Sequence, residues 1–304
     1  MNILRPITIT DSMVVSSLPL VEDSTPAWVS GTSYTVGQEV HRKQTHRVYR
    51  CAAATSGTTP PEQAITTWAD VRPTNRWALF DYYTNTKTSN PTGITYEFSL
   101  GSRAVNAVYL RGFSDGVTQL NIYDATGTLV STQYRDNTAP PGGWYEYLFN
   151  EPVVLNYLLF DNLVLQHNWK IKISIINYPE DASIGLLTIG DLVPLGNNAS
   201  GSGVERGSSA EPITYSYINT EEDGTTTIRK RHSATNLRLS STVPTSEADN
   251  AVYVIQSVLD TPVAVIADSQ NNQLQGLSTF GLVSGSVTYD YTTANISLNV
   301  KGLV

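Results

Sequence analysis

Four aromatic residues near the start of the chain have the types and spacing to bind a sugar. Trp28, Tyr34, Tyr49 and Trp68 are separated by short segments that contain glycine turns. The faces of pyranose rings present C–H groups, and such groups pack favourably on aromatic rings. The same four rings can equally form the core of a unit of about 45 residues, because so short a segment has little other apolar material to bury. The pattern therefore leaves two interpretations, a sugar site and a structural core.

A second aromatic group follows a loop that is rich in proline and glycine. Residues 140–143 read Pro-Pro-Gly-Gly, and Trp144, Tyr145 and Tyr147 come directly after them. A rigid surface loop with these residues predicts either an exposed binding tip built around Trp144 or a structural turn whose Trp144 packs on the edge of a sheet.

Two basic groups lie on expected hairpins. Residues 41–47 contain two arginines, one lysine and two histidines, which could contact an anionic polysaccharide or an acidic partner subunit, or could simply be solvated. Residues 229–232 read Arg-Lys-Arg-His and suit a contact between subunits. The net charge of the chain is −8, which argues against nucleic acid as a partner because nucleic-acid binding usually needs a basic face.

The minimum parts of the common enzyme classes are missing from the sequence. Its carboxylates are scattered, whereas glycoside hydrolysis needs two carboxylates in contrasting environments. It has no nucleophile elbow between a strand and a helix, no phosphate loop and no dinucleotide fingerprint. Its four histidines are dispersed, and its single cysteine, Cys51, excludes a cysteine-rich zinc site and an internal disulfide framework. We therefore expect no enzyme activity, no catalytic residue, no metal and no cofactor.

The elements that must position these residues are almost all strands. Of the 304 residues, 40% are hydrophobic and only 15% are charged, and apolar residues alternate or form short runs between Gly, Pro, Asn and Asp. Expected strands include residues 105–110, 171–176 and 251–259, and a hairpin turn is expected at 223–224. The only helix candidate is 179–187. No apolar run approaches the ~20 residues of a membrane helix, so we expect no membrane insertion.

The order of these segments predicts an all-β fold. A small three-stranded module is followed by a jelly-roll-like β-sandwich domain and by a second β-rich domain at the C-terminus. Residues 7–10 could add a strand to another domain or to a neighbouring subunit. The expected divisions are an N-terminal arm at 1–25, the small module at 26–72, the β-sandwich at 73–187, a flexible linker or loop at 188–211 and the C-terminal domain at 212–304.

The small module resembles carbohydrate-binding modules of the chitin-binding type. The resemblance lies in the order Trp28, Tyr34 with Gly37, Tyr49 and Trp68. It implies that these aromatic residues could hold a carbohydrate. Sugar-binding members carry exposed aromatic residues after the central tyrosine, whereas this chain has alanine at 52–54. That difference favours the structural interpretation of the four rings.

The layout of nearly the whole chain resembles a family of bacteriophage tail proteins. The resemblance is carried by residues 5–11, 26–28, 73–81, 189–190 with 215–216, and 296–303, and its most specific part is Asn-Arg-Trp-Ala-Leu-Phe-Asp at 75–81. It implies a structural component of a bacteriophage tail or tail tip in the virion, made in the host cytoplasm. Its partners would be other tail subunits, attached fibres and further copies of itself.

The alternative function is recognition of a host. In that reading a tail protein binds host surface polysaccharide through the small module or through the loop at Trp144. Exposed aromatic residues would favour recognition, and aromatic residues buried against other subunits would favour a scaffold.

Overall fold

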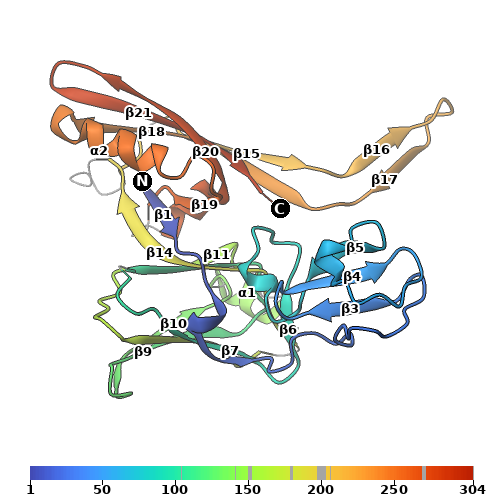
Figure 1. Ribbon diagram of the computed structural model, residues 1–304. Coiled ribbons are helices and arrows are strands. Elements are labelled where there is room, and N and C mark those ends of the chain that lie inside the picture. Colours follow the sequence, from blue (N-terminus) through green and yellow to red (C-terminus); the bar gives the residue numbers. More distant parts are fainter. Residues whose placement is uncertain are drawn as a thin grey trace.

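The structure is a computed structural model that describes residues 1–103, 105–140, 142–149, 153–178, 181–196, 203–205, 207–268 and 272–303. Strands dominate it, so the expected all-β fold is confirmed. Figure 1 shows three parts: long C-terminal strands across the top, a sandwich below them, and the small module to one side. Short 3-10 turns occur at Asp11–Met13, Pro61–Gln63, Ala78–Phe80 and Asn272–Leu277.

The small module has one antiparallel sheet in the order β3-β4-β5. Its buried cluster contains Tyr34, Val40, Tyr49, Cys51 and Trp68. The module is therefore built around its own aromatic residues, as a unit of this size requires. The strands are β3 (Glu39–Arg42), β4 (Arg47–Cys51) and β5 (Trp68–Pro73).

The β-sandwich packs a five-stranded sheet, in the order β10-β9-β12-β7-β2, against part of a nine-stranded sheet. Buried residues alternate with partly exposed ones along β7, where Ile94, Tyr96 and Phe98 point into the core. The strands of the five-stranded sheet are β2 (Val14–Leu18), β7 (Ile94–Ser99), β9 (Val117–Tyr123), β10 (Leu129–Asp136) and β12 (Lys170–Ile176).

The nine-stranded sheet joins the sandwich to the C-terminal part. Its order is β11-β8-β14-β1-β19-β20-β21-β18-β15, so β1 lies between a strand of the sandwich and a strand of the C-terminal part. β14 runs through the division expected at 187–188. The strands are β1 (Asn2–Pro6), β8 (Ala107–Arg111), β11 (Tyr157–Phe160), β14 (Leu186–Pro194), β15 (Ser209–Thr214), β18 (Ser233–Pro244), β19 (Val263–Ile266), β20 (Ser278–Tyr289) and β21 (Thr293–Gly302).

The N-terminal segment inserts into this chain's own sheet. The inserted strand is β1, and Ile3 and Leu4 in it are fully buried. The strand expected at 7–10 is therefore placed a few residues too late; the first of those residues, Ile7, donates its backbone N–H to the carbonyl of Ile189. Buried Ile and Leu side chains make the strand a part of the fold.

The C-terminal part contains one long helix where the sequence analysis expects a strand. Residues 251–259, expected as a strand, lie mostly in the helix α2 (Thr245–Gln256), which packs on β18, β20 and β21. Its buried residues Ala248, Ala251, Val254 and Ile255 follow helical spacing, and this period was missed because the apolar run is short. Conversely, the helix expected at 179–187 is wrong over residues 181–187, since residues 179–180 lie outside the described part: β13 (Ala182–Ile184) pairs with β6 (Thr88–Asn90), and β14 begins at Leu186.

The segment expected as a linker at 188–211 begins within β14 and ends within β15. Residues 197–202 and 206 lie outside the described residues. Beyond β15 the chain forms a separate hairpin with its turn at 223–224, as the sequence predicts. Its strands are β16 (Tyr217–Thr220) and β17 (Thr226–Arg229).

Candidate functional site

A network of charged groups lies at the joint between the small module and the sandwich. Asp23 is buried and accepts hydrogen bonds from the Arg72 guanidinium at 2.7 and 2.9 Å and from the backbone N–H groups of Thr25 and Asn75. Burial opposes ionisation of Asp23, but these hydrogen bonds outweigh it and hold the pKa of Asp23 well below its usual range. The carboxylate is therefore charged in the folded protein at neutral pH.

A second contact of the same joint centres on His46. Its imidazole stacks on the Trp77 ring with 3.9 Å between centroids, and its Nδ1 lies 2.8 Å from Glu22. Burial opposes ionisation of Glu22, but hydrogen bonds from His46 and Thr74 together with the charges of His46 and Arg76 lower its pKa. His46 lies in the turn between β3 and β4, so the tip of this hairpin contacts the sandwich.

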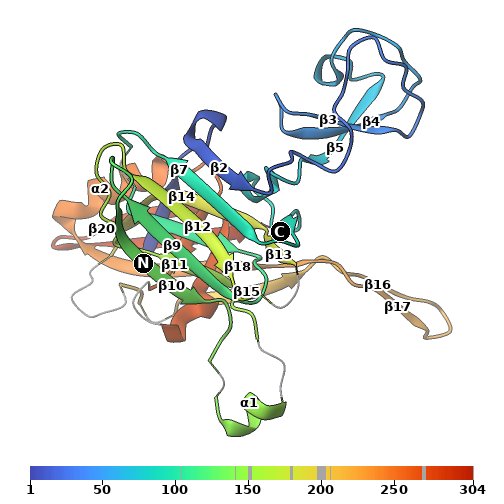
Figure 2. The same cartoon turned by 90° about the horizontal axis from the view of Figure 1, so that it is seen from below.

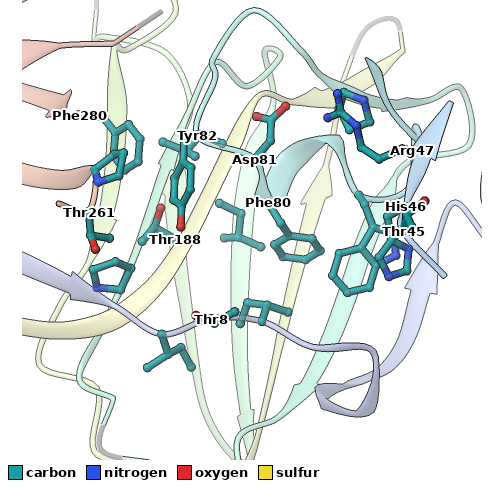
Figure 3. Close-up of a pocket in the computed structure, with 18 residues that line it drawn as sticks. Thr8, Thr45, His46, Arg47, Phe80, Asp81, Tyr82, Thr188, Thr261 and Phe280 are labelled. Atoms are coloured by element: carbon teal, nitrogen blue, oxygen red, sulfur yellow. The ribbon is translucent and has the colours of Figure 1, made fainter. Parts of the chain in front are cut away.

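The joint leaves a cavity of about 450 Å³, which we call the joint pocket. Its walls come from the segment after β1, the β3–β4 turn, the 3-10 turn at Ala78–Phe80 and the start of β14. Two residues just before β19 and Phe280 of β20 complete them. Figure 3 shows the Tyr82 ring in this pocket between Phe280 and Phe80, with the hydroxyls of Thr188 and Thr261 nearby. Concave sites of this size at junctions between domains are typical of ligand sites.

The joint pocket combines an exposed ring with polar groups. The Tyr82 side chain is 49% exposed. Asp81 accepts hydrogen bonds from the Thr86 hydroxyl at 2.5 Å and the Tyr83 N–H at 2.8 Å, yet burial raises its pKa above the usual value. The hydroxyls of Thr188 and Thr261 make no hydrogen bond among the described residues. The pocket therefore holds groups that can still gain partners from a ligand.

The four aromatic residues of the small module lie together, mostly as its core. Tyr34, Tyr49 and Trp68 are buried, and the rings of Tyr34 and Trp68 pack edge to face at 5.2 Å. The Tyr34 hydroxyl accepts a hydrogen bond from the N–H of Val29 at 2.8 Å. The burial of these three rings favours the interpretation as a structural core. Trp28 is half-buried and lies under the Arg42 guanidinium at 4.8 Å, a cation–π contact.

Trp144 is placed far from that module. It begins the short helix α1 (Trp144–Phe149), which Figure 2 shows standing away from the sandwich. Trp144 is 74% exposed and Tyr147 is 75% exposed, and the neighbouring rings of Tyr145 and Phe149 contact each other at 4.9 Å. This exposed tip contradicts the expectation of a Trp144 packed on a sheet edge.

Sequence reasoning missed the pocket residues that matter most. Asp81 belongs to the motif at 75–81 that was singled out as specific, but no role was given to it, and Tyr82 comes directly after that motif. Thr188 and Thr261 carry no local signal, because only the packing of distant segments places them together. Within the described ranges, no group of three or more His, Cys, Asp or Glu side chains is placed to hold a metal ion, and no helix is long and apolar enough to cross a membrane.

Comparisons with known proteins give structural neighbours only. No protein-family model and no curated protein matches the chain. A fucose-binding module from Streptococcus pneumoniae is 16% identical with a TM-score of 0.28, covering 39% of this chain and 85% of the module. The lectin domain of lectinolysin complexed with Lewis B antigen is 11% identical with a TM-score of 0.23, covering 34% and 69%.

A third neighbour is a variant of chitosan-binding module 1 from a chitosanase/glucanase of Paenibacillus sp. IK-5. It is 12% identical with a TM-score of 0.26, covering 38% of this chain and 83% of the module. The three neighbours are all carbohydrate-binding modules. At these TM-scores the likeness carries no argument about the ligand of this chain.

Proposed function

We propose that this chain is a non-enzymatic glycan-binding protein and that the joint pocket is its sugar site. The observation that carries the proposal is the half-exposed Tyr82 ring beside Asp81 and two unpaired hydroxyls in a cavity of about 450 Å³. Sugar recognition needs an aromatic face for the C–H side of the ring and acceptors or donors for its hydroxyls. The host-surface polysaccharide of a bacterium is the ligand class that we favour.

Each of the four groups in the joint pocket would contact a different part of the sugar. The pyranose face would stack on Tyr82, and sugar hydroxyls would donate to the Asp81 carboxylate. Burial already disfavours the charge of Asp81, so added hydrogen bonds to its ionised form are favourable. Thr188 and Thr261 would complete the contacts to the sugar. Arg47 also lines the pocket, but its guanidinium is paired with Asp70 at 2.7 Å, so it is less free to bind an anionic group.

The experiment measures the affinity of the full chain for a panel of oligosaccharides released from bacterial surface polysaccharides, first on an array and then by calorimetry. Tyr82→Ala should weaken binding about tenfold, because an aromatic stack contributes ~1–1.5 kcal/mol. Tyr82→Phe should retain binding. Tyr83→Ala is the matched control, since Tyr83 is the equally exposed neighbour whose side chain does not line the pocket.

Two results would overturn this assignment. If Tyr82→Ala binds like the wild type and Trp144→Ala does not, the sugar site lies at the α1 tip and the joint pocket has another role. If the wild-type chain binds no member of the panel, glycan binding itself is rejected.

A second candidate function is a structural subunit of a bacteriophage tail or tail tip that holds other subunits or fibres. The hairpin β16–β17 favours it, because all eight residues of its strands are exposed. The resemblance of residues 75–81 to tail proteins also supports this candidate. Detection of the chain in purified tails by mass spectrometry tests it, and absence from the tails rejects it.

A further inference from the structure

The hairpin beyond β15 and β18 has little support from the rest of its own fold. We call residues 215–232 the extended hairpin. Figures 1 and 2 show it reaching away from the nine-stranded sheet and standing clear of the sandwich. Every residue of β16 and β17 is exposed. A two-stranded hairpin without a covering layer is marginally stable in water, so this one is suited to packing against a partner.

One face of the extended hairpin is apolar at its centre. Ile218 pairs directly with Ile228, and Thr220 pairs with Thr226, so these four side chains share one face. The two isoleucines are 60% and 59% exposed. Burying this pair would be favourable, because removal of aliphatic surface from water stabilises an interface.

The charges of the extended hairpin are separated along its length. Its tip carries Glu221, Glu222 and Asp223, and its base carries Arg229, Lys230 and Arg231. None of these six side chains forms an ion pair with another described residue. Glu221 lies opposite Thr225 at the turn, and Lys230 lies five positions beyond Thr225, which is about 17 Å along a strand. Arg229 pairs with Tyr217 and points to the face opposite the isoleucines.

We propose that two copies of this chain associate through their extended hairpins, laid antiparallel with the Ile218–Ile228 faces together. In this arrangement the acidic tip of each copy lies near Lys230 and Arg231 at the base of the other. A two-fold interface must be self-complementary, with each contact repeated in reverse. A hairpin that carries opposite charges at its two ends and an apolar pair between them meets that condition with no other protein.

The proposal is tested by charge reversal in the full chain. We expect the wild type to dimerise in sedimentation velocity and to dissociate as salt is raised, since exposed charge pairs are screened. The tip variant Glu221→Lys with Glu222→Lys and the base variant Lys230→Glu with Arg231→Glu should each dimerise at least ten times more weakly, since Arg229 points away from the isoleucine face. Lys43→Glu, an exposed reversal on the small module, is the control and should dimerise like the wild type.

Mixing provides the decisive readout. In the mixture, the lysine tip of one variant meets the glutamate base of the other, and the native tip meets the native base, so dimers should return. Unchanged melting temperatures will show that the variants are folded, because the substituted residues are exposed. A monomeric wild type overturns the proposal. So does a dimer that survives both reversals, or a mixture that fails to associate.

Discussion

The small module and the extended hairpin are both small β units at the side of the molecule. They differ in whether their strands cover a buried core. In the module, Trp68 is 3% exposed and packs with Tyr34, Tyr49 and Val40. In the hairpin, even the central isoleucine pair is exposed. The comparison teaches that strand pairing alone does not make a stable unit; a buried layer does.

The two regions also differ in whether their charged side chains form ion pairs. In the module, Arg42 pairs with Glu62, Arg47 with Asp70, and Arg50 with Glu39. The basic group at 41–47 is therefore largely neutralised within the module, which weakens its reading as a site for anionic polysaccharide. The three basic residues at 229–231, at the base of the extended hairpin, have no such partners among the described residues. Unpaired charge thus coincides with unburied apolar surface in the same hairpin.

The largest expected effect comes from removing the module's core. Trp68→Ala should lower the free energy of unfolding of the module by about 3–5 kcal/mol, because a large aromatic side chain leaves a cavity. Hydrogen exchange of the amides in β3 and β4 measures this loss. Trp144→Ala is the matched control, and its ring is exposed, so its effect should stay within about 0.5 kcal/mol. Equal losses of unfolding free energy in the two variants would contradict the assignment of Trp68 to the core and of Trp144 to the surface.

A smaller effect concerns the joint that holds the module. Asp23→Asn should cost about 2–3 kcal/mol at pH 7, because it removes charge-assisted hydrogen bonds to a buried group. The pKa of Asp23 is lowered in the folded state, so its contribution is present above the usual carboxyl value near ~4 and is lost as pH falls below it. The pKa of Glu22 is also lowered and acts in the same direction.

Thermal unfolding between pH 2 and pH 7 checks this prediction. The wild type should lose stability towards acid, and Asp23→Asn should lose less over the same range. Parallel curves for the two proteins would show that Asp23 does not contribute through its charge.

The smallest effect on stability is expected in the hairpin. Ile218→Ser with Ile228→Ser should change the unfolding free energy of the monomer by no more than about 0.5 kcal/mol, because both side chains are already in water. The same variant should dimerise more weakly in sedimentation velocity. Val40→Ser in the module provides the contrast, since Val40 is buried and its substitution should be strongly destabilising. A large loss of monomer stability from the hairpin variant would mean that the hairpin is covered by its own chain.

Much of the fold could be predicted from local pattern. The apolar run at 171–176 indicates a strand, which the structure has as β12, and Asp-Gly at 223–224 indicates the hairpin turn. The pattern was misleading at α2, because four apolar residues within a short run fit a strand as well as a helix, and only packing on three strands distinguishes them. Of the expected sugar residues, Trp144 is exposed, whereas Tyr34, Tyr49 and Trp68 are core.

The sequence by itself determined the all-β class, the aromatic module and the charged hairpin, since each depends on residues that are close in the chain. Only the tertiary structure decided that β1 lies between β14 and β19 and that Thr188 and Thr261 share a pocket with Tyr82. These contacts join segments far apart in sequence. Their free energy comes from burying surfaces that match only after both partners have folded, and no local pattern encodes that match.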